Sequence, residues 1–267
     1  MKLDYGMLLS PEPISLSIGT LRKPTLRDIS RLTFDRFSMY EMFLDIDLRD
    51  FYDTVFANGD TFWDSLSEQE KDTITLYEAV VKDERLQGSY CEVFDFFFVE
   101  KVIYRDGLFL LLNDGVEQDK DIYAPDDVRG AITSNTFTQA IDLIQQVCCI
   151  HSDAEEEKDM KFKNEAARKM YEQMRRAQKE AERQKAKNGN SNFSIPNLIS
   201  AVSNRHPCIS PINVWDLTIF QLLDSFNRLE IGALYDINWT RVAVWGDEKK
   251  QFDSTLWYKN NQKKDVF

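Results

Sequence analysis

The 267-residue chain has little of the material from which most catalytic and metal sites are built. It contains two histidines, His151 and His206, and four irregularly spaced cysteines. Its ten glycines are scattered and form no phosphate-binding loop. Cys-His or Ser-His catalysis therefore has few candidate residues, and Cys148-Cys149-Ile150-His151 lacks a second ligand pair at zinc-site spacing. We predict no catalytic residue, no metal site and no cofactor, with Cys148 and Cys149 filling a buried helix end.

Long apolar runs are also missing. No stretch approaches the ~20 apolar residues that a membrane-spanning helix needs. The opening MKLDYGMLLSPEPIS has one lysine and no extended apolar core, so a signal peptide is not expected. The four cysteines are too few for a disulfide scaffold in a chain of this length. These absences predict a cytosolic protein with reduced cysteines and no membrane partner.

Acidic residues outnumber basic ones by 45 to 33, which gives a formal net charge of −12. Such a balance argues against nucleic-acid binding, because a polyanion would be repelled unless a local basic patch prevailed. One acidic cluster, formed by Asp45, Asp47, Asp50 and Asp53, could hold Mg²⁺ for phosphoryl chemistry. A solvated acidic face is the favoured interpretation, since positions 45 and 47 point to different sides of a helix.

Composition divides the chain into three parts, and the predicted fold class is α+β, predominantly helical. Residues 1–152 are expected to form a mixed α+β domain, since apolar and aromatic residues are abundant there. Residues 153–192 form a charged helix and flexible linker, acidic first and basic last, which complements the helix dipole. Residues 193–267 form a small, Trp-rich, mainly helical module.

The first domain is expected to begin with a strand and continue with helices. Ile14, Leu16 and Ile18 alternate with small or polar residues, as in a half-buried strand. Thr25 suits the N-cap of a helix over residues 26–32. Helical spacing continues over residues 37–52. The apolar positions of that helix are Met39, Met42, Phe43 and Ile46.

Capping and turn signals predict the rest of this domain. Ser67 and Glu70 have capping-box spacing, and so do Thr136 and Gln139. The first box should start a helix that buries Ile74, Tyr77, Val80 and Val81. The second should start one that buries Phe137, Ile141, Ile144 and Val147. The aromatic run over 90–98 fits a helix face, although a strand stays open, and Asp106-Gly107 predicts a β-hairpin.

Two helices are expected in the C-terminal module. Ser194 should cap one that extends through Val202, and apolar spacing from Val214 to Leu229 predicts a longer one. Residues 242–245 could be strand or helix, and Gly246 should end the element. Trp215, Trp239, Trp245 and Trp257 are expected to pack this module, with partner anchoring as the alternative.

The candidate partner-binding residues come from two helices. In the linker, Met170 and Met174 belong to a narrow apolar stripe with Phe162 and Ala166, although a solvated spacer helix is the simpler interpretation. In the C-terminal module, Trp215 and Phe220 are the candidates. For Trp215 a core position is favoured over an exposed anchor, because the helix stripe needs it to complete its first turn.

Five short strings of the sequence carry a family resemblance. They are Asp4-Tyr5-Gly6, Ser10-Pro11-Glu12-Pro13-Ile14, Lys23-Pro24-Thr25-Leu26, Ile212-Asn213-Val214-Trp215-Asp216-Leu217-Thr218 and Phe220-Gln221-Leu222. The chain resembles tail assembly chaperones and related tail-morphogenesis proteins of phages and prophages of Gram-positive bacteria. The resemblance spans both ends and much of the chain. The two parts that some such families join by translational frameshifting lie here in one uninterrupted chain.

The resemblance implies a non-enzymatic protein of the host cytoplasm that binds tape-measure and tail-tube proteins and is absent from the finished tail. Two modules on a semi-rigid arm agree with this expectation, because binding one partner raises the effective concentration of the second. The alternatives are a structural tail or baseplate component and a small nucleic-acid-processing factor that uses Asp45, Asp47 or the basic part of the linker. Whether the chain forms an oligomer is left open.

Overall fold

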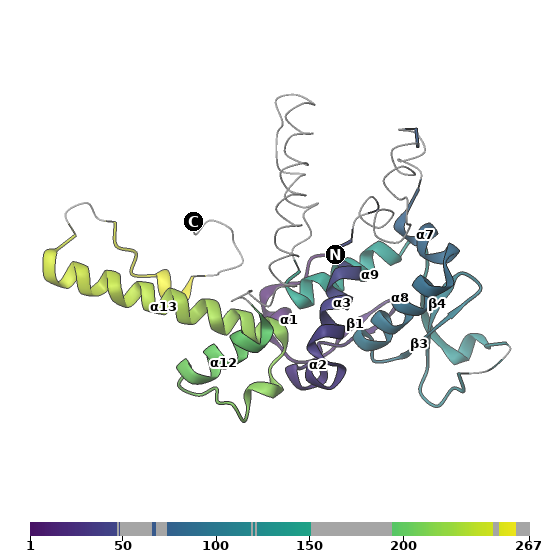
Figure 1. Cartoon of the computed structure of the whole chain (residues 1–267), viewed down its shortest axis with the longest axis horizontal. Helices are drawn as coiled ribbons and strands as arrows, with labels where there is room; N and C mark the ends of the chain where they lie inside the picture. The colour runs from purple at the N-terminus through teal and green to yellow at the C-terminus, as the bar shows by residue number, and fades with distance from the viewer. Residues whose placement is uncertain are drawn as a thin grey trace. The chain divides into compact units, whose positions relative to one another are not determined.

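The computed structural model describes residues 1–46, 48, 66–67, 74–118, 120, 122–150, 194–247 and 251–259. It divides the chain into two compact units. The first comprises residues 1–150 with 218–220, and the second comprises 151–217 with 221–267. The arrangement is α+β and predominantly helical, as the sequence predicted (Figure 1).

The first unit opens with a short helix and a hairpin. Helix α1 spans Tyr5–Leu9, and β1 (Ile14–Leu16) pairs antiparallel with β2 (Gly19–Leu21). The predicted strand is confirmed but ends at Leu16, because residues 17 and 18 turn the chain into β2. The buried Lys23 amine donates hydrogen bonds to the carbonyls of Met7 and Ser10 and so satisfies the end of α1.

Helix α2 spans Leu26–Leu32 and begins, as predicted, at Thr25, whose side chain forms a capping box with Asp28. Helix α3 then spans Phe34–Leu44. Helical spacing at Met39 and Met42 does not mark the buried face of this helix, because both residues are exposed while Phe37, Tyr40 and Leu44 are buried. The aromatic rings decide this orientation, since Phe37 and Tyr40 contact Phe96 at centroid distances of 6.3 and 5.8 Å.

Helix α7 (Leu76–Lys82) starts at Thr75, which forms a capping box with Glu78. The prediction that Ser67 starts the helix containing Tyr77 and Val80 is therefore wrong, because a second box lies closer to these residues. Residues 68–73 lie outside the described ranges. Helix α8 (Glu84–Phe97) confirms the helical interpretation of the aromatic run, and it buries Tyr90, Val93, Phe94 and Phe97.

A three-stranded antiparallel sheet follows, in the order β3 (Lys101–Arg105), β4 (Leu108–Leu112) and β5 (Val128–Ile132). The predicted hairpin is confirmed. Asp106 and Gly107 have φ values of 48° and 82°, as a type I′ turn requires. Strand β5 was not predicted. It follows a 3₁₀ turn over Pro125–Asp127.

Helix α9 (Phe137–Cys148) buries the predicted stripe. Its predicted capping box is wrong, because the Thr136 hydroxyl accepts a hydrogen bond from the Thr133 amide at 2.8 Å instead of capping α9. Cys148 is buried at the helix end, as expected. At the centre of the core the ring of Phe94 meets those of Phe109 and Phe137 edge-on, at 5.1 and 5.7 Å between centroids.

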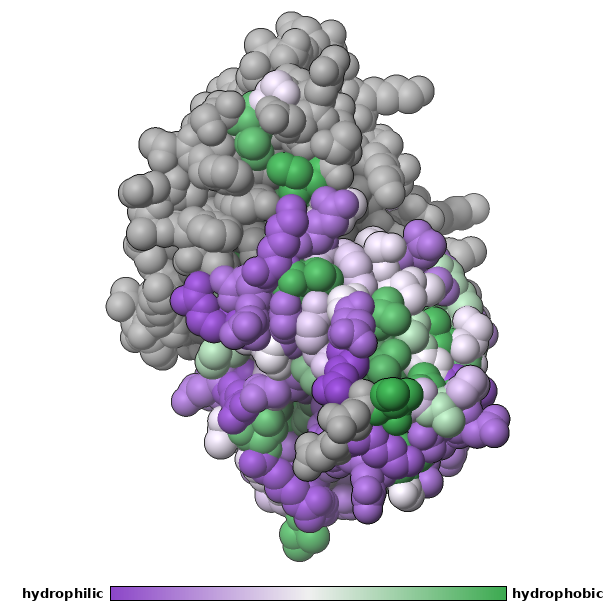
Figure 2. Space-filling view, turned by 90° about the vertical axis from the view of Figure 1, so that its right-hand side faces the viewer, coloured by the Kyte–Doolittle hydropathy of each residue, from purple (hydrophilic) through white to green (hydrophobic). Residues whose placement is uncertain are grey.

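Figure 2 views the molecule from the side of β3 and β4, where hydrophilic residues are interspersed with smaller groups of hydrophobic ones. Among the apolar side chains described in this unit, Ile122 is exposed at 85%, Met1 at 58% and Val99 at 55%. They are isolated in the sequence, and scattered apolar residues of this kind are normal on a protein surface. The exposed apolar residues of the first unit therefore do not mark a binding surface.

The second unit contains helix α12 (Ile195–Arg205), a 3₁₀ turn over Val214–Asp216 and most of helix α13 (Ile219–Trp245). Ser194 caps α12, as predicted. The long helix begins at Ile219 and not at Val214, because Leu217 is extended and breaks the helical path. Residues 242–245 are helical, and Gly246, at a φ of +76°, follows the last turn as expected.

Candidate partner-binding surface

The second half of α13 is apolar, yet none of its residues from 231 to 245 is buried. Leu234 is 48% exposed, Trp239 is 55% exposed and Trp245 is 77% exposed. A helix in a globular unit normally buries one apolar stripe. Contiguous exposed apolar residues instead indicate a contact with another molecule.

Five aromatic side chains of α13 and of the segment that follows it make up what we call the aromatic surface. They are Tyr235, Trp239, Phe252, Trp257 and Tyr258. Tyr235 and Trp239, one turn apart, lie nearly parallel with centroids 6.5 Å apart. Phe252 approaches them at 5.5 and 5.6 Å, and Trp257 meets Tyr258 edge-on at 5.1 Å. The cluster thus joins α13 to the segment that follows it.

That segment, residues 251–259, returns along α13 (Figure 1). Gly246 begins the reversal, and the Asp247 carboxylate accepts hydrogen bonds from the amides of Gln251 at 3.0 Å and Phe252 at 2.9 Å. These two amides hold the pKa of Asp247 below its usual value. Because the carboxylate fixes the backbone at Phe252, it also fixes one ring of the aromatic surface.

The far end of the segment is held by Arg228 and Asp253. The Arg228 guanidinium donates to the backbone carbonyls of Trp257 at 3.4 Å and Lys259 at 2.8 Å. Asp253 pairs with the Lys259 amine and accepts from the Thr255 hydroxyl at 2.6 Å. Lys259 and Thr255 together lower the pKa of Asp253 to about 2. The aromatic surface is therefore positioned by polar contacts that do not cover its rings.

Such a surface suits protein binding better than the binding of a small molecule. Trp and Tyr provide large rigid contact areas and dominate the energetics of many protein interfaces. Trp257 and Tyr258 are 55% and 57% exposed, so their rings are available for contact. The rings also present polar N–H and O–H groups at their edges, which can bind a partner's polar rim.

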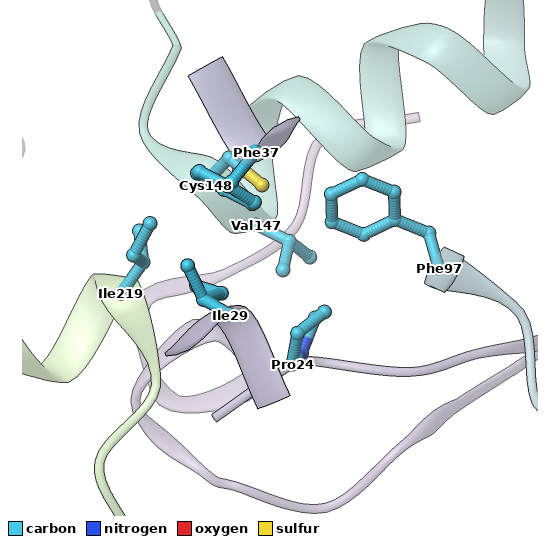
Figure 3. Close-up of a pocket in the computed structure, with 7 residues that line it drawn as sticks. All are labelled: Pro24, Ile29, Phe37, Phe97, Val147, Cys148 and Ile219. Carbon is cyan, nitrogen blue, oxygen red and sulfur yellow. The ribbon is translucent and has the colours of Figure 1, made fainter. Parts of the chain in front are cut away.

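An apolar hollow in the first unit is a gap in core packing (Figure 3). Its side chains come from the segment before α2 and from α2, α3, α8, α9 and the start of α13, and the space between them has no room for a water molecule. Small-molecule sites are much larger and combine apolar walls with placed polar groups. The lining residues are Pro24, Ile29, Phe37, Phe97, Val147, Cys148 and Ile219.

The predicted partner-binding residues do not belong to the aromatic surface. Met170 and Met174 lie outside the described residues. Trp215 is half-buried in its 3₁₀ turn, where the indole N–H donates to the Pro211 carbonyl at 3.0 Å. Phe220 is only 7% exposed and its ring packs edge-on against Tyr5 at 5.9 Å. In this conformation a partner cannot reach Phe220.

Trp239 and Trp257 were expected to pack the module, and partner anchoring was left as the alternative. Their exposure favours the alternative for these two residues. The i, i+4 spacing of Tyr235 and Trp239, followed closely by further Trp and Tyr residues, is a signal that could have identified the surface. Spacing alone did not show which side of the helix is covered.

The residues considered for metal binding are only partly described. Asp45 caps the end of α3, whereas Asp47, Asp50, Asp53 and His151 lie outside the described ranges. His206 is occupied locally, since its Nδ1 accepts from the amides of Cys208 at 3.2 Å and Ile209 at 3.1 Å. Within the described part of the chain, no three His, Cys, Asp or Glu side chains are grouped as metal ligands. No helix in that part is long and apolar enough to span a membrane.

Residues 184–262 match a protein family described as the YomV second domain, a phage-type family. The matched segment contains α12, α13 and the whole aromatic surface. The match covers less than half of the chain and, at this coarser level, supports the expected phage association. Comparisons with curated proteins and with solved structures gave no significant match.

Proposed function

We propose that the chain is a non-enzymatic phage tail assembly factor, a chaperone that binds tape-measure or tail-tube proteins in the host cytoplasm. The observation that carries the proposal is the exposed aromatic surface, which lies within the segment that matches a phage-type family. The resemblance of both chain ends to tail-morphogenesis proteins supports the finer assignment to tail assembly.

The surface fits a partner whose own apolar residues need temporary cover. Tail proteins before assembly carry surfaces that will later be buried against other subunits, and such surfaces aggregate when exposed. Trp239, Trp257 and Tyr258 offer a mixed apolar and polar contact area that does not require a deep pocket. The net charge of −12 helps to keep a bound, aggregation-prone partner in solution.

Co-purification from phage-producing cells tests the proposal. The tagged chain is compared with a Trp239→Ala/Trp257→Ala variant, and tape-measure and tail-tube proteins are quantified by mass spectrometry. Because both rings are more than half exposed, the variant should fold normally but recover tail proteins at least tenfold less well. Ile122→Ala removes an exposed apolar side chain of the first unit and is the matched control, which should bind as the parent does.

Two results would overturn the proposal. One is recovery of tail proteins that is equal for the parent and the double variant, or absent for both. The other is found by mass spectrometry of purified virions. A chaperone should be missing from the finished particle, whereas a copy number that matches a tail or baseplate ring would show that the chain is a structural component.

A further inference from the structure

Helix α13 carries a second surface that the aromatic rings do not occupy, and we call it the seam. It consists of Glu230, Leu234, Ile237, Arg241 and Val244, which recur at alternating spacings of four and three. This spacing places all five on one face of a helix. Each is exposed, with Ile237 and Val244 at 65% and 64%.

The seam lies on a different side of α13 from the aromatic surface. At 3.6 residues per turn, Arg228, Tyr235 and Trp239 project more than ~90° away from the centre of the seam. These three residues contact the returning segment 251–259. The chain's own C-terminal segment therefore covers one side of α13 and leaves the seam open.

The charges of the seam are arranged symmetrically about its apolar centre. Glu230 and Arg241 flank Leu234 and Ile237 at equal separations, four residues beyond each. Glu230 and Arg241 are eleven residues apart, which is ~16 Å along the axis, so they cannot pair with each other within one helix. A complementary partner must therefore present a positive charge opposite Glu230 and a negative charge opposite Arg241.

A second copy of the same helix, running antiparallel, presents that pattern. With a two-fold axis between residues 235 and 236, Leu234 meets Ile237 of the other copy, and Glu230 meets Arg241. Two-fold symmetry makes each of these contacts occur twice. A parallel arrangement would instead bring Glu230 against Glu230 and Arg241 against Arg241, and like charges at a helix interface repel.

We propose that two copies of this chain associate through an antiparallel α13 pair along the seam. The contact buries the exposed centre of the seam in both copies and forms two ion pairs at its ends. A single pair of helices is smaller than a standard interface of ~800 Å² per partner, so the dimer should be reversible and depend on concentration. The aromatic surface stays free in the dimer, and the inference does not rest on the proposed function.

Sedimentation equilibrium of the full chain over a wide concentration range tests this arrangement. The parent should show a monomer–dimer equilibrium. Glu230→Arg and Arg241→Glu each create two repulsive pairs in a homodimer, and each should weaken association at least tenfold. Asp236→Arg is the matched control, because Asp236 is an exposed charge on the same helix but off the seam. It should associate as the parent does.

Charge exchange identifies the antiparallel register. The double variant Glu230→Arg/Arg241→Glu regains two attractive pairs and should dimerise as the parent does. A mixture of the two single variants should form a heterodimer, because both of its cross-pairs are attractive. All variants replace exposed residues, and circular-dichroism melting verifies that each is folded.

The inference is overturned by any of three results. The parent could be monomeric at every concentration, the single reversals could leave dimerisation unchanged, or folded double and mixed variants could fail to regain it. None of these results bears on tail-protein binding, which is measured separately on the aromatic surface.

Discussion

Gly130 packs so closely against Ile18 that a Cβ atom at position 130 would lie 2.4 Å from the Ile18 carbonyl oxygen. Gly130 lies in β5, and Ile18 lies in the turn between β1 and β2. The contact brings the N-terminal hairpin onto the three-stranded sheet. Any side chain at position 130 would push the two backbones apart, so only glycine fits.

Gly130→Ala should therefore destabilise the first unit by about 2 kcal/mol or more, because neither backbone can yield as a flexible side chain would. Urea unfolding measures the loss. Gly88→Ala is the control, since a Cβ at this exposed position in α8 meets no atom within 4 Å. That change should stabilise the protein by about 0.5–1 kcal/mol. Equal effects of the two substitutions would contradict the close approach at Gly130.

Glu41 should make stability depend on pH. Burial raises the pKa of its carboxyl group to about 7 in the folded protein, whereas an unfolded glutamate has a pKa of about 4.3. The neutral carboxyl is compatible with burial, so the contribution of Glu41 to the free energy of unfolding has its full value below about pH 4.3. It is lost as the pH rises towards 7, because the unfolded state ionises first.

Glu41→Gln removes this dependence. The variant should match the parent at pH 4 and exceed its free energy of unfolding at pH 8, by about 4 kcal/mol at most. Urea unfolding at the two pH values gives the comparison. Asp114→Asn changes an exposed position and is the control. Its free energy of unfolding should change between the two pH values as much as that of the parent. A parent whose stability rises between pH 5 and pH 7 relative to Glu41→Gln would show that burial does not act on this group.

Gln145 joins two helices through a buried hydrogen bond, in which its side-chain amide donates to the Leu44 carbonyl at 2.7 Å. Gln145→Leu leaves that carbonyl without this donor and should cost about 1–3 kcal/mol. Gln139→Leu changes an exposed position on the same helix and should have an effect below about 0.5 kcal/mol. Thermal melting of both variants decides whether the bond matters, and indistinguishable melting temperatures would show that it does not.

Trp215 should contribute to stability and not to partner binding. It is half-buried and its indole donates to the Pro211 carbonyl, so Trp215→Ala should lower the melting temperature. The same variant should recover tail proteins as well as the parent, because Trp215 is not part of the aromatic surface. Unchanged melting combined with lost recovery would make Trp215 a partner anchor and move the binding site.

Three signals that act within a few residues predicted the local structure correctly, whereas the capping boxes expected at Ser67 and Thr136 did not form as predicted. Thr25 and Ser194 cap the helices expected of them, and Asp106-Gly107 forms the expected turn. In each case the deciding hydrogen bond or dihedral angle lies within three residues. Tertiary packing changes such outcomes little, so the sequence alone was sufficient.

Predictions that depend on distant contacts were less successful. The buried face of α3 is chosen by rings that it meets on α8, and those rings are more than fifty residues away. Strand β5 forms because it pairs with β4, although its sequence Val-Arg-Gly-Ala-Ile has no clear alternation. The spacing of Ser67 and Glu70 matches a capping box as well as that of Thr75 and Glu78, so the sequence alone did not show that Thr75 caps α7. At Thr136 the hydroxyl bonds to the Thr133 amide instead of capping α9. These outcomes required knowledge of the neighbours.

The aromatic surface shows the same limit. Tryptophan in a small module is usually a packing residue, and its sequence pattern is the same whether the ring is covered or exposed. Trp239 contacts Tyr235 and Phe252 and is still 55% exposed. Exposure of this kind follows from the path of the chain after Gly246, which the local sequence did not determine.

The most direct test of the account is the affinity of the purified full chain for purified tape-measure and tail-tube proteins, measured by isothermal titration calorimetry. The parent should bind at least one of them, and Trp239→Ala/Trp257→Ala should weaken that binding about 30-fold or more while its melting temperature changes little. No binding of either protein by the parent, or equal affinity of parent and variant, would contradict the claim that the aromatic surface serves tail assembly.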